Sequence, residues 1–182
     1  TLLIVGHGAE AVRASVVGSG ALCVLQEPQL GTGHAVQQAV PHLPADGTAV
    51  VLSGDVPLTQ ADTLRALVAA SAGERLALLT VTLPDPTGYG RIVRNADGAV
   101  QGIVEHKDAS DAQKAIRQIN TGVLCAGTAD LKRWLGTLGN DNAQGEYYLP
   151  DLVGIYAQDG RAVDAQVVAD ADEIRGINTR AE

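Results

Sequence analysis

Short apolar segments recur along the chain and alternate with amphipathic ones. Eight apolar runs have the length and residue content of strands, at 2–6, 21–25, 48–53, 75–83, 91–94, 99–106, 121–127 and 161–169. Between most of them lie segments with helical periodicity, at 9–17, 33–43, 60–72, 109–118, 129–138 and 146–158. Strands that alternate with helices predict an α/β domain with a mostly parallel, doubly wound sheet.

One segment, RIVRNADGAVQGIVEH, departs from this alternation. Asp97 and Gly98 join its two strand patterns directly, and such a dipeptide is typical of a tight hairpin turn. We therefore expect a small antiparallel hairpin inserted in the sheet. Thr59, with Asp62 three residues later, predicts a capping box before the helix at 60–72.

Composition narrows the class of protein. A chain of 182 residues with 46% hydrophobic residues predicts one domain, and a net charge of -8 argues against nucleic acid or an anionic membrane as a partner. No apolar run approaches the roughly 18 residues of a membrane span, and no leader pattern opens the chain. Cys23 and Cys125 lie in apolar runs without ligand spacing, which favours buried free thiols and a cytoplasmic location.

A carboxylate follows the strand TAVVLS. Asp55 lies just past the strand end between Gly54 and Pro57, in the region where ligands gather on open α/β sheets. Its local sequence favours a simple turn residue. The alternative is a ligand of Mg²⁺, a hard cation that prefers carboxylate oxygen and is usually held by one or two protein groups plus phosphates.

A glycine-rich turn opens the helix at 33–43. The sequence QEPQLGTGHAVQQAV lacks the third glycine of a dinucleotide fingerprint, because Val36 stands at that position. The backbone NH groups of Gly31, Thr32 and Gly33 could still bind a base or a phosphate, and the amide of Gln26 could bind the edge of a base. An ordinary strand-to-helix turn explains the same residues.

Further candidates lie in the second half of the chain. Gly90 in the loop LPDPTGYGRIVR would let a ligand lie against the backbone, and Glu105 at the end of the hairpin could accept hydrogen bonds from sugar hydroxyls. Asn120, at the start of a strand, is compatible with a turn residue or with a ligand contact, and Asn178 in its short polar turn is expected to be structural. The four histidines share no zinc spacing and favour surface or loop roles, and the tyrosines of EYYLPDLVGIY are expected to face the core.

Seven motifs in one order resemble a known family. QLGTGHAVQQA, SGDVPL, DPTGYGRIVR, GIVEHKDAS, INTGVL, NDNAQGEYYLPD and GINTR are similar to the uridylyltransferase domain of bacterial N-acetylglucosamine-1-phosphate uridylyltransferases, over nearly all 182 residues. The resemblance implies a Rossmann-like nucleotidyltransferase fold. It also implies transfer of the uridylyl group of UTP to N-acetylglucosamine 1-phosphate, which gives UDP-N-acetylglucosamine and pyrophosphate for cell-wall precursors.

The resemblance also implies residue roles. Gln26, Gly31 and Thr32 would hold the uracil end, Ser53 and Gly54 would line the nucleotide, and Gly90, Glu105 and Asn120 would contact the N-acetylglucosamine part. Asp55 and Asn178 would act through Mg²⁺ as its ligands. Ser53 departs from the family, in which a tyrosine often precedes the Gly-Asp pair, so a contact made through that ring is not expected here.

Family features are missing at both ends. The glycine-rich loop with Arg and Lys that embraces the triphosphate does not occur, and neither does the β-helix acetyltransferase domain that forms homotrimers in the bifunctional enzyme. Residues 1–182 therefore look like an incomplete uridylyltransferase domain, with activity expected of the intact domain. The alternatives are a related sugar-1-phosphate nucleotidyltransferase and a sugar-nucleotide-binding module without catalysis, while Val36 disfavours a nicotinamide-dependent oxidoreductase.

Overall fold

The computed structural model describes residues 1–177. Its strands are β1 (Leu2–Val5), β2 (Leu22–Leu25), β3 (Thr48–Val51), β4 (Leu76–Thr82), β5 (Arg91–Arg94), β6 (Val100–Val104), β7 (Gln118–Gly127) and β8 (Val163–Val167). Its α-helices are α1 (Ala9–Ser15), α2 (Thr32–Ala39), α3 (Ala61–Ser71), α4 (Asp111–Lys114), α5 (Thr128–Leu135) and α6 (Asp151–Gln158). Two 3-10 helices, η1 (Val40–His42) and η2 (Ala171–Ile174), complete the elements.

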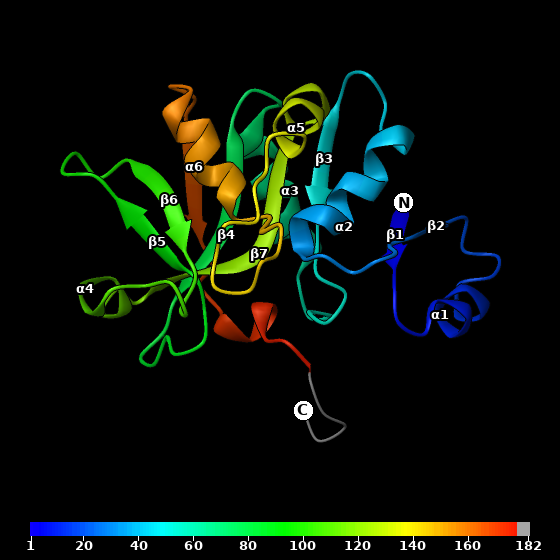
Figure 1. Cartoon of the computed structure of the whole chain (residues 1–182), viewed down its shortest axis with the longest axis horizontal. Coiled ribbons are helices and arrows are strands. Elements are labelled where there is room, and N and C mark those ends of the chain that lie inside the picture. The colour runs from blue at the N-terminus through cyan, green and yellow to red at the C-terminus, as the bar shows by residue number, and fades with distance from the viewer. Residues whose placement is uncertain (178–182) are drawn as a thin grey trace.

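The strands form two sheets. Six strands make a mixed sheet in the order β6-β5-β7-β4-β8, with β3 also paired to β7, and β1 and β2 pair in parallel in a separate sheet. β3 and β4 both run antiparallel to β7, and β4 runs parallel to β8. β3, β4 and β8 therefore share one direction and β7 has the opposite one. In Figure 1 the two-stranded sheet lies to one side of the larger one, beside β3 and α2.

The core occupies both faces of the larger sheet. Because side chains alternate along a strand, Leu76 and Leu78 of β4 belong to one apolar cluster and Ala77 and Leu79 to the other. The first cluster includes residues of α2, α5 and α6, and the second includes Leu67 of α3. Figure 1 shows the corresponding layers, with α5 and α6 in front of the sheet and α3 behind it. Helices on both faces confirm the predicted α/β architecture.

The hairpin is confirmed. β5 and β6 pair antiparallel with Ile92 opposite Ile103, and the turn between them contains Gly98 at φ +83°. A positive φ is costly for residues with a Cβ, which explains the glycine. The sequence did not show that β7 would also run against its neighbours, because its apolar run fits either strand direction.

Three local predictions were wrong. The helix expected at 109–118 is only α4, which has a capping box made by Ser110 and Gln113, and Gln118 already begins β7. The helix expected at 146–158 begins at Asp151, because the preceding residues pair with the glycine-rich turn. Thr59 does not cap α3; its hydroxyl donates to Glu173 O at 3.1 Å, so it holds η2 against the start of that helix.

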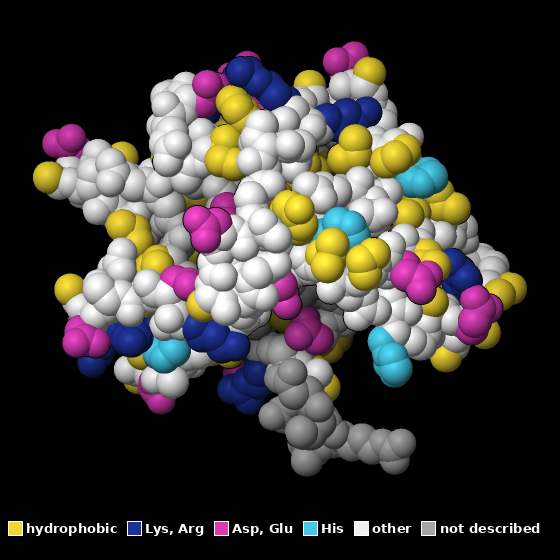
Figure 2. Space-filling view, viewed as in Figure 1, with side chains coloured by type: hydrophobic (Ala, Val, Ile, Leu, Met, Phe, Trp, Pro, Cys, Tyr) yellow, Lys and Arg dark blue, Asp and Glu magenta, His cyan; other side chains and the backbone are white. Residues whose placement is uncertain are grey.

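The cysteines and the apolar character of the helices can be compared with the expectations drawn from composition. Cys23 and Cys125 are free, the second buried and the first only half-buried. Among residues 1–177, no helix has both the length and the apolar character needed to cross a membrane. On the face shown in Figure 2, Lys and Arg side chains are interspersed with Asp and Glu and form no continuous basic surface.

Candidate active site

A cavity of about 490 Å³ lies between the two sheets and the hairpin. Its lining includes Ile4 of β1, Thr32 of α2, Ser53 after β3, Glu105 after β6 and Asn120 of β7. Four of these five residues are candidates from the sequence. The fold therefore brings Thr32, Ser53, Glu105 and Asn120 to one hollow, although they come from distant parts of the chain.

The glycine-rich turn forms one wall of this cavity. Gly31 has φ +107°, and a Cβ there would lie 2.7 Å from Tyr147 O, so only glycine fits at this position. Gly33 N donates a hydrogen bond to Tyr147 O at 2.7 Å, and Thr32 Oγ1 accepts one from Leu149 N at 3.0 Å. The turn is thus held against residues 146–150, which explains why that segment is not helical.

Gln26 lies behind the same turn. Its Nε2 donates to Gly31 O at 3.0 Å and lies 3.1 Å from Nδ1 of His34. Gln26 also lines a second cavity, of about 460 Å³, formed with Gly6 and residues 25–29. Gln26, Gly31 and Thr32 are therefore contiguous, and His34, for which the sequence favoured a surface or loop role, is a half-buried part of this network.

Asp55 lies outside the main cavity, on the loop after β3. The side chain is exposed, and within residues 1–177 its carboxylate has no hydrogen-bond or ion-pair partner. Its backbone oxygen accepts a hydrogen bond from Ile177 N at 2.8 Å. Asn178, the other predicted metal ligand, lies outside the described residues. No group of three or more His, Cys, Asp or Glu in the described part of the chain is arranged to hold a metal.

Gly54 has an open environment. Within residues 1–177, a Cβ at this position would meet no heavy atom within 4 Å, and the φ of Gly54 is not in the left-handed region. The backbone at Gly54 therefore does not require glycine for packing.

Glu105 and Asn120 line the other wall of the cavity, and Gly90 lies beside both of them. Asn120 N donates to Gly90 O at 2.8 Å, and a Cβ on Gly90 would lie 2.9 Å from Glu105 Oε1. Gly90 therefore lies against both Glu105 and Asn120. Burial raises the pKa of Glu105, and the nearby carboxylates of Asp151 and Asp108 raise it further, while Arg91 opposes the shift.

Arg91 was not a candidate from the sequence. It is 1% exposed, and its guanidinium donates to Tyr89 O, to Lys114 O at 3.4 Å, and lies 3.2 Å from His106 Nδ1. In the described part of the chain, Nε of Arg91 has no hydrogen-bond partner. The charged group therefore joins the loop before β5, the loop after β6 and the end of α4. An arginine inside the strand pattern RIVR resembles any solvent-facing strand position, so the sequence carried no signal of this role.

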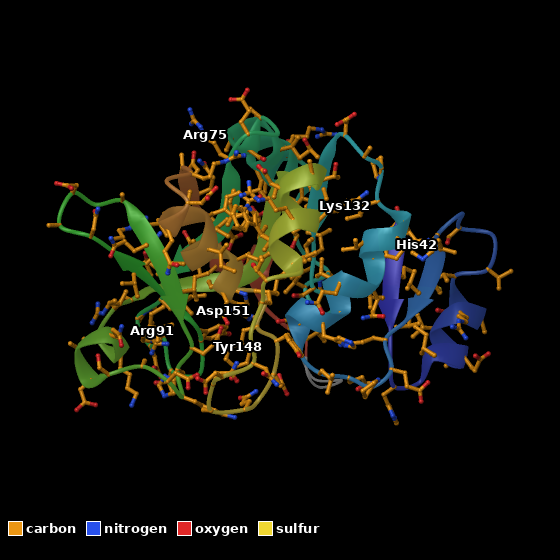
Figure 3. The ribbon with its side chains drawn as sticks, turned by 45° about the horizontal axis from the view of Figure 1, so that its top comes forward. His42, Arg75, Arg91, Lys132, Tyr148 and Asp151 are labelled. Carbon is orange, nitrogen blue, oxygen red and sulfur yellow. The ribbon has the colours of Figure 1, made fainter. Side chains whose placement is uncertain are left out.

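The sequence pattern predicted that Tyr148 packs in the core and that Asp151 lies within a helix. Both residues also lie near the carboxylates of Glu105 and Asp108. Figure 3 shows both where α6 begins, beside the hairpin that carries Arg91. Tyr148 lines the cavity, and its pKa is raised by burial and by the carboxylates around it, Asp108 first. Burial and Asp108 also raise the pKa of Asp151. The motif EYYLPD, which was quoted for its resemblance, was the available signal.

A cavity beyond the carboxyl ends of strands, a glycine-rich turn at the start of a helix and an exposed carboxylate after β3 fit an α/β protein of the nucleotidyltransferase class. The chain belongs to the MobA-like NTP transferase domain family, whose model matches residues 1–120.

The chain is also similar in sequence to individual curated proteins. The chain is 59% identical to the bifunctional protein GlmU of Paracidovorax citrulli, over 98% of the chain and 38% of that protein. It is 58% identical to the bifunctional protein GlmU of Acidovorax sp. and 53% identical to that of Pseudomonas putida, over 100% and 98% of the chain. The chain spans about two fifths of the length of these curated relatives, 38% to 40%.

Solved structures support the fold. A putative glucose-1-phosphate thymidylyltransferase from Bacillus anthracis, in complex with a sucrose, superposes with a TM-score of 0.70 at 18% identity, over 92% of this chain and 67% of that one. HddC from Yersinia pseudotuberculosis superposes with a TM-score of 0.62 at 18% identity, over 91% and 68% of the two chains. At these identities the similarity concerns the fold alone.

Proposed function

We propose that this chain is the uridylyltransferase part of a protein that transfers the uridylyl group of UTP to N-acetylglucosamine 1-phosphate. The observation that carries the proposal is that Thr32, Ser53, Glu105 and Asn120 line the same cavity. The family resemblance assigns the first two residues to the nucleotide and the last two to the sugar. The identity of 53% to 59% to GlmU proteins over almost the whole chain supports the same assignment. A cytoplasmic location is part of the proposal, supported by the two free cysteines.

In this proposal the two walls bind the two substrates. Gln26, Gly31 and Thr32 bind the base, and Ser53 and Gly54 line the nucleotide. Gly90, Glu105 and Asn120 bind the N-acetylglucosamine part, for which Glu105 supplies acceptor oxygens for hydroxyl groups. The contact of Gly90 with both Glu105 and Asn120 supports a shared role for these three residues.

Asp55 suits a Mg²⁺ site. Mg²⁺ is usually bound by one or two carboxylates together with phosphate oxygens and waters, and Asp55 offers an exposed carboxylate without a partner in residues 1–177. We propose Asn178 as the second ligand, because the hydrogen bond from Ile177 N to Asp55 O brings the preceding residue beside Asp55. When bound, Mg²⁺ supplies neutralisation of phosphate charge in a chain whose own net charge is -8.

The chemistry then needs little from protein acids or bases. An oxygen of the sugar phosphate attacks the α-phosphorus of UTP in line, the bond to the β-phosphate breaks, and pyrophosphate leaves. The attacking oxygen is already ionised at neutral pH, so no side chain has to remove a proton. The residues of the two walls contribute by orienting the substrates, which supplies a large part of the barrier reduction in such reactions.

A substitution at Asp55 tests the assignment. Asp55→Asn in the full-length protein that contains this chain is expected to lower Mg²⁺-dependent pyrophosphate release by about a hundredfold or more, with cooperative unfolding retained. Asp46→Asn is the matched control, because Asp46 is also exposed and lies on a loop at the other end of β3. Near-normal turnover of Asp55→Asn would contradict the metal assignment, and substrate binding without any pyrophosphate release by the wild type would favour a binding module.

A further inference from the structure

We infer that His34 is a positioning residue that selects the base, by fixing the orientation of the Gln26 amide; this inference rests on the proposed function. The two side chains come from different elements. Gln26 directly follows β2, and His34 lies in the first turn of α2. Gln26 Nε2 lies 3.1 Å from His34 Nδ1, so this contact connects the residues on either side of the glycine-rich turn.

The Gln26 amide has only one orientation that satisfies its neighbours. Gly31 O is an obligate acceptor 3.0 Å from Gln26 Nε2, so the NH₂ group of the amide faces the turn. The second N–H of this group points at His34 Nδ1, which accepts it when the ring proton is on Nε2. Both amide donors are then used within the protein. Among the described residues no hydrogen bond uses Gln26 Oε1, so this side chain presents only an acceptor to a ligand.

An acceptor held in this way distinguishes pyrimidines. Uracil carries an N–H at N3, whereas cytosine carries a lone pair there. A fixed amide oxygen pairs with the uracil N–H and repels the cytosine lone pair. The reversed amide would present N–H donors, which suit cytosine. The anchors on the amide therefore decide which base fits, because an unpaired polar group in a binding site is costly.

An acceptor at His34 Nδ1 requires the tautomer with the proton on Nε2. Gln38 Nε2 lies 3.2 Å from His34 Nε2 and 3.1 Å from His34 O. A neutral imidazole cannot accept at both nitrogens, so only one of the two glutamines donates to the ring. Each amide is also held by a backbone carbonyl, Gln26 by Gly31 O and Gln38 by His34 O. We assign the acceptor to Nδ1 because Gln26 makes the shorter of the two ring contacts, 3.1 Å against 3.2 Å. The centroid of the Tyr147 ring lies 6.2 Å from that of the imidazole.

The test compares two substitutions of His34 in the full-length protein. His34→Asn keeps an acceptor oxygen near the position of Nδ1, and His34→Leu keeps volume without an acceptor. For His34→Leu we expect the ratio of kcat/KM for UTP to that for CTP to fall about 5–10-fold, since a neutral hydrogen bond contributes about 1 kcal/mol and 1.4 kcal/mol is tenfold. The kcat at saturating UTP should change little, and His34→Asn should restore most of the ratio.

Controls separate this inference from the proposed function. His42→Leu alters an exposed histidine of η1 and should leave the ratio unchanged. A wild type that is active on UTP, with an unchanged ratio in His34→Leu, would overturn the inference alone. A wild type without uridylyl transfer would overturn both. Independently of activity, the ¹⁵N spectrum of His34 in this chain should show protonated Nε2 and unprotonated Nδ1; the reverse tautomer would contradict the inference.

Discussion

Arg91 offers a sharp test of how the cavity is held in shape. It is 1% exposed and its guanidinium connects Tyr89 O, Lys114 O and His106. Arg91→Met keeps most of the apolar stem and leaves these acceptors without a donor. Hydrogen bonds to charged groups contribute about 1.5–3 kcal/mol each, and the unpaired Nε already offsets part of the total. We expect a net loss of about 2–3 kcal/mol in the free energy of unfolding.

Arg94→Met is the matched control on the same strand. Arg94 is exposed and donates to Gly98 O at 2.8 Å and to Gln118 Oε1 at 3.2 Å. Exposed substitutions of this kind change stability by about 0.5 kcal/mol or less. Urea unfolding of the three proteins measures the difference directly. A difference below about 1 kcal/mol between Arg91→Met and Arg94→Met would refute the claim that the buried guanidinium holds the loops, given those expected values.

Three further predictions concern single residues of the candidate site, Gln26, Gly54 and Glu105. Gln26→Ala should lower the ratio of kcat/KM for UTP to that for CTP, and an unchanged ratio would remove Gln26 from base recognition. Gly54→Ala and Gly139→Ala both have room for a Cβ at a permitted φ, so both should fold as stably as the wild type by thermal unfolding, while only Gly54→Ala should raise the KM for UTP; equal KM values would argue against a nucleotide at Gly54. The raised pKa of Glu105 means that the folded state binds this proton more tightly than the unfolded state, so its contribution to stability declines as pH rises upward from its ordinary 4.5. Glu105→Gln should therefore lose less stability than the wild type between about pH 4 and pH 7, as followed by urea unfolding, and an identical pH profile would contradict this cause of the shift.

The sequence predicted the strands and the hairpin well because their signals are local. The apolar runs around β4 and β7 and the Asp97-Gly98 turn need no tertiary information. The direction of β7 was not accessible, since a buried strand is apolar on both faces whichever way it runs. The end of α4 was also missed, because the pairing of Gln118 with Thr82 on β4 overrides helical periodicity.

In the candidate site, too, some residues could be predicted from local sequence and others could not. Thr32, Ser53, Glu105 and Asn120 were named from motifs, and the fold places them in one cavity. Arg91 could not be found, because its burial depends on three segments that meet only in the folded chain. The roles of the site residues remain predictions until ligands are bound.

Transfer by the full-length protein that contains this chain, measured as pyrophosphate release in the presence of Mg²⁺, tests the central claim most directly. The panel pairs UTP, CTP and dTTP with N-acetylglucosamine 1-phosphate and glucose 1-phosphate. The account predicts the highest kcat/KM for UTP with N-acetylglucosamine 1-phosphate and no release when Mg²⁺ is removed. A preference for another pair, or release that is independent of the metal, would contradict it.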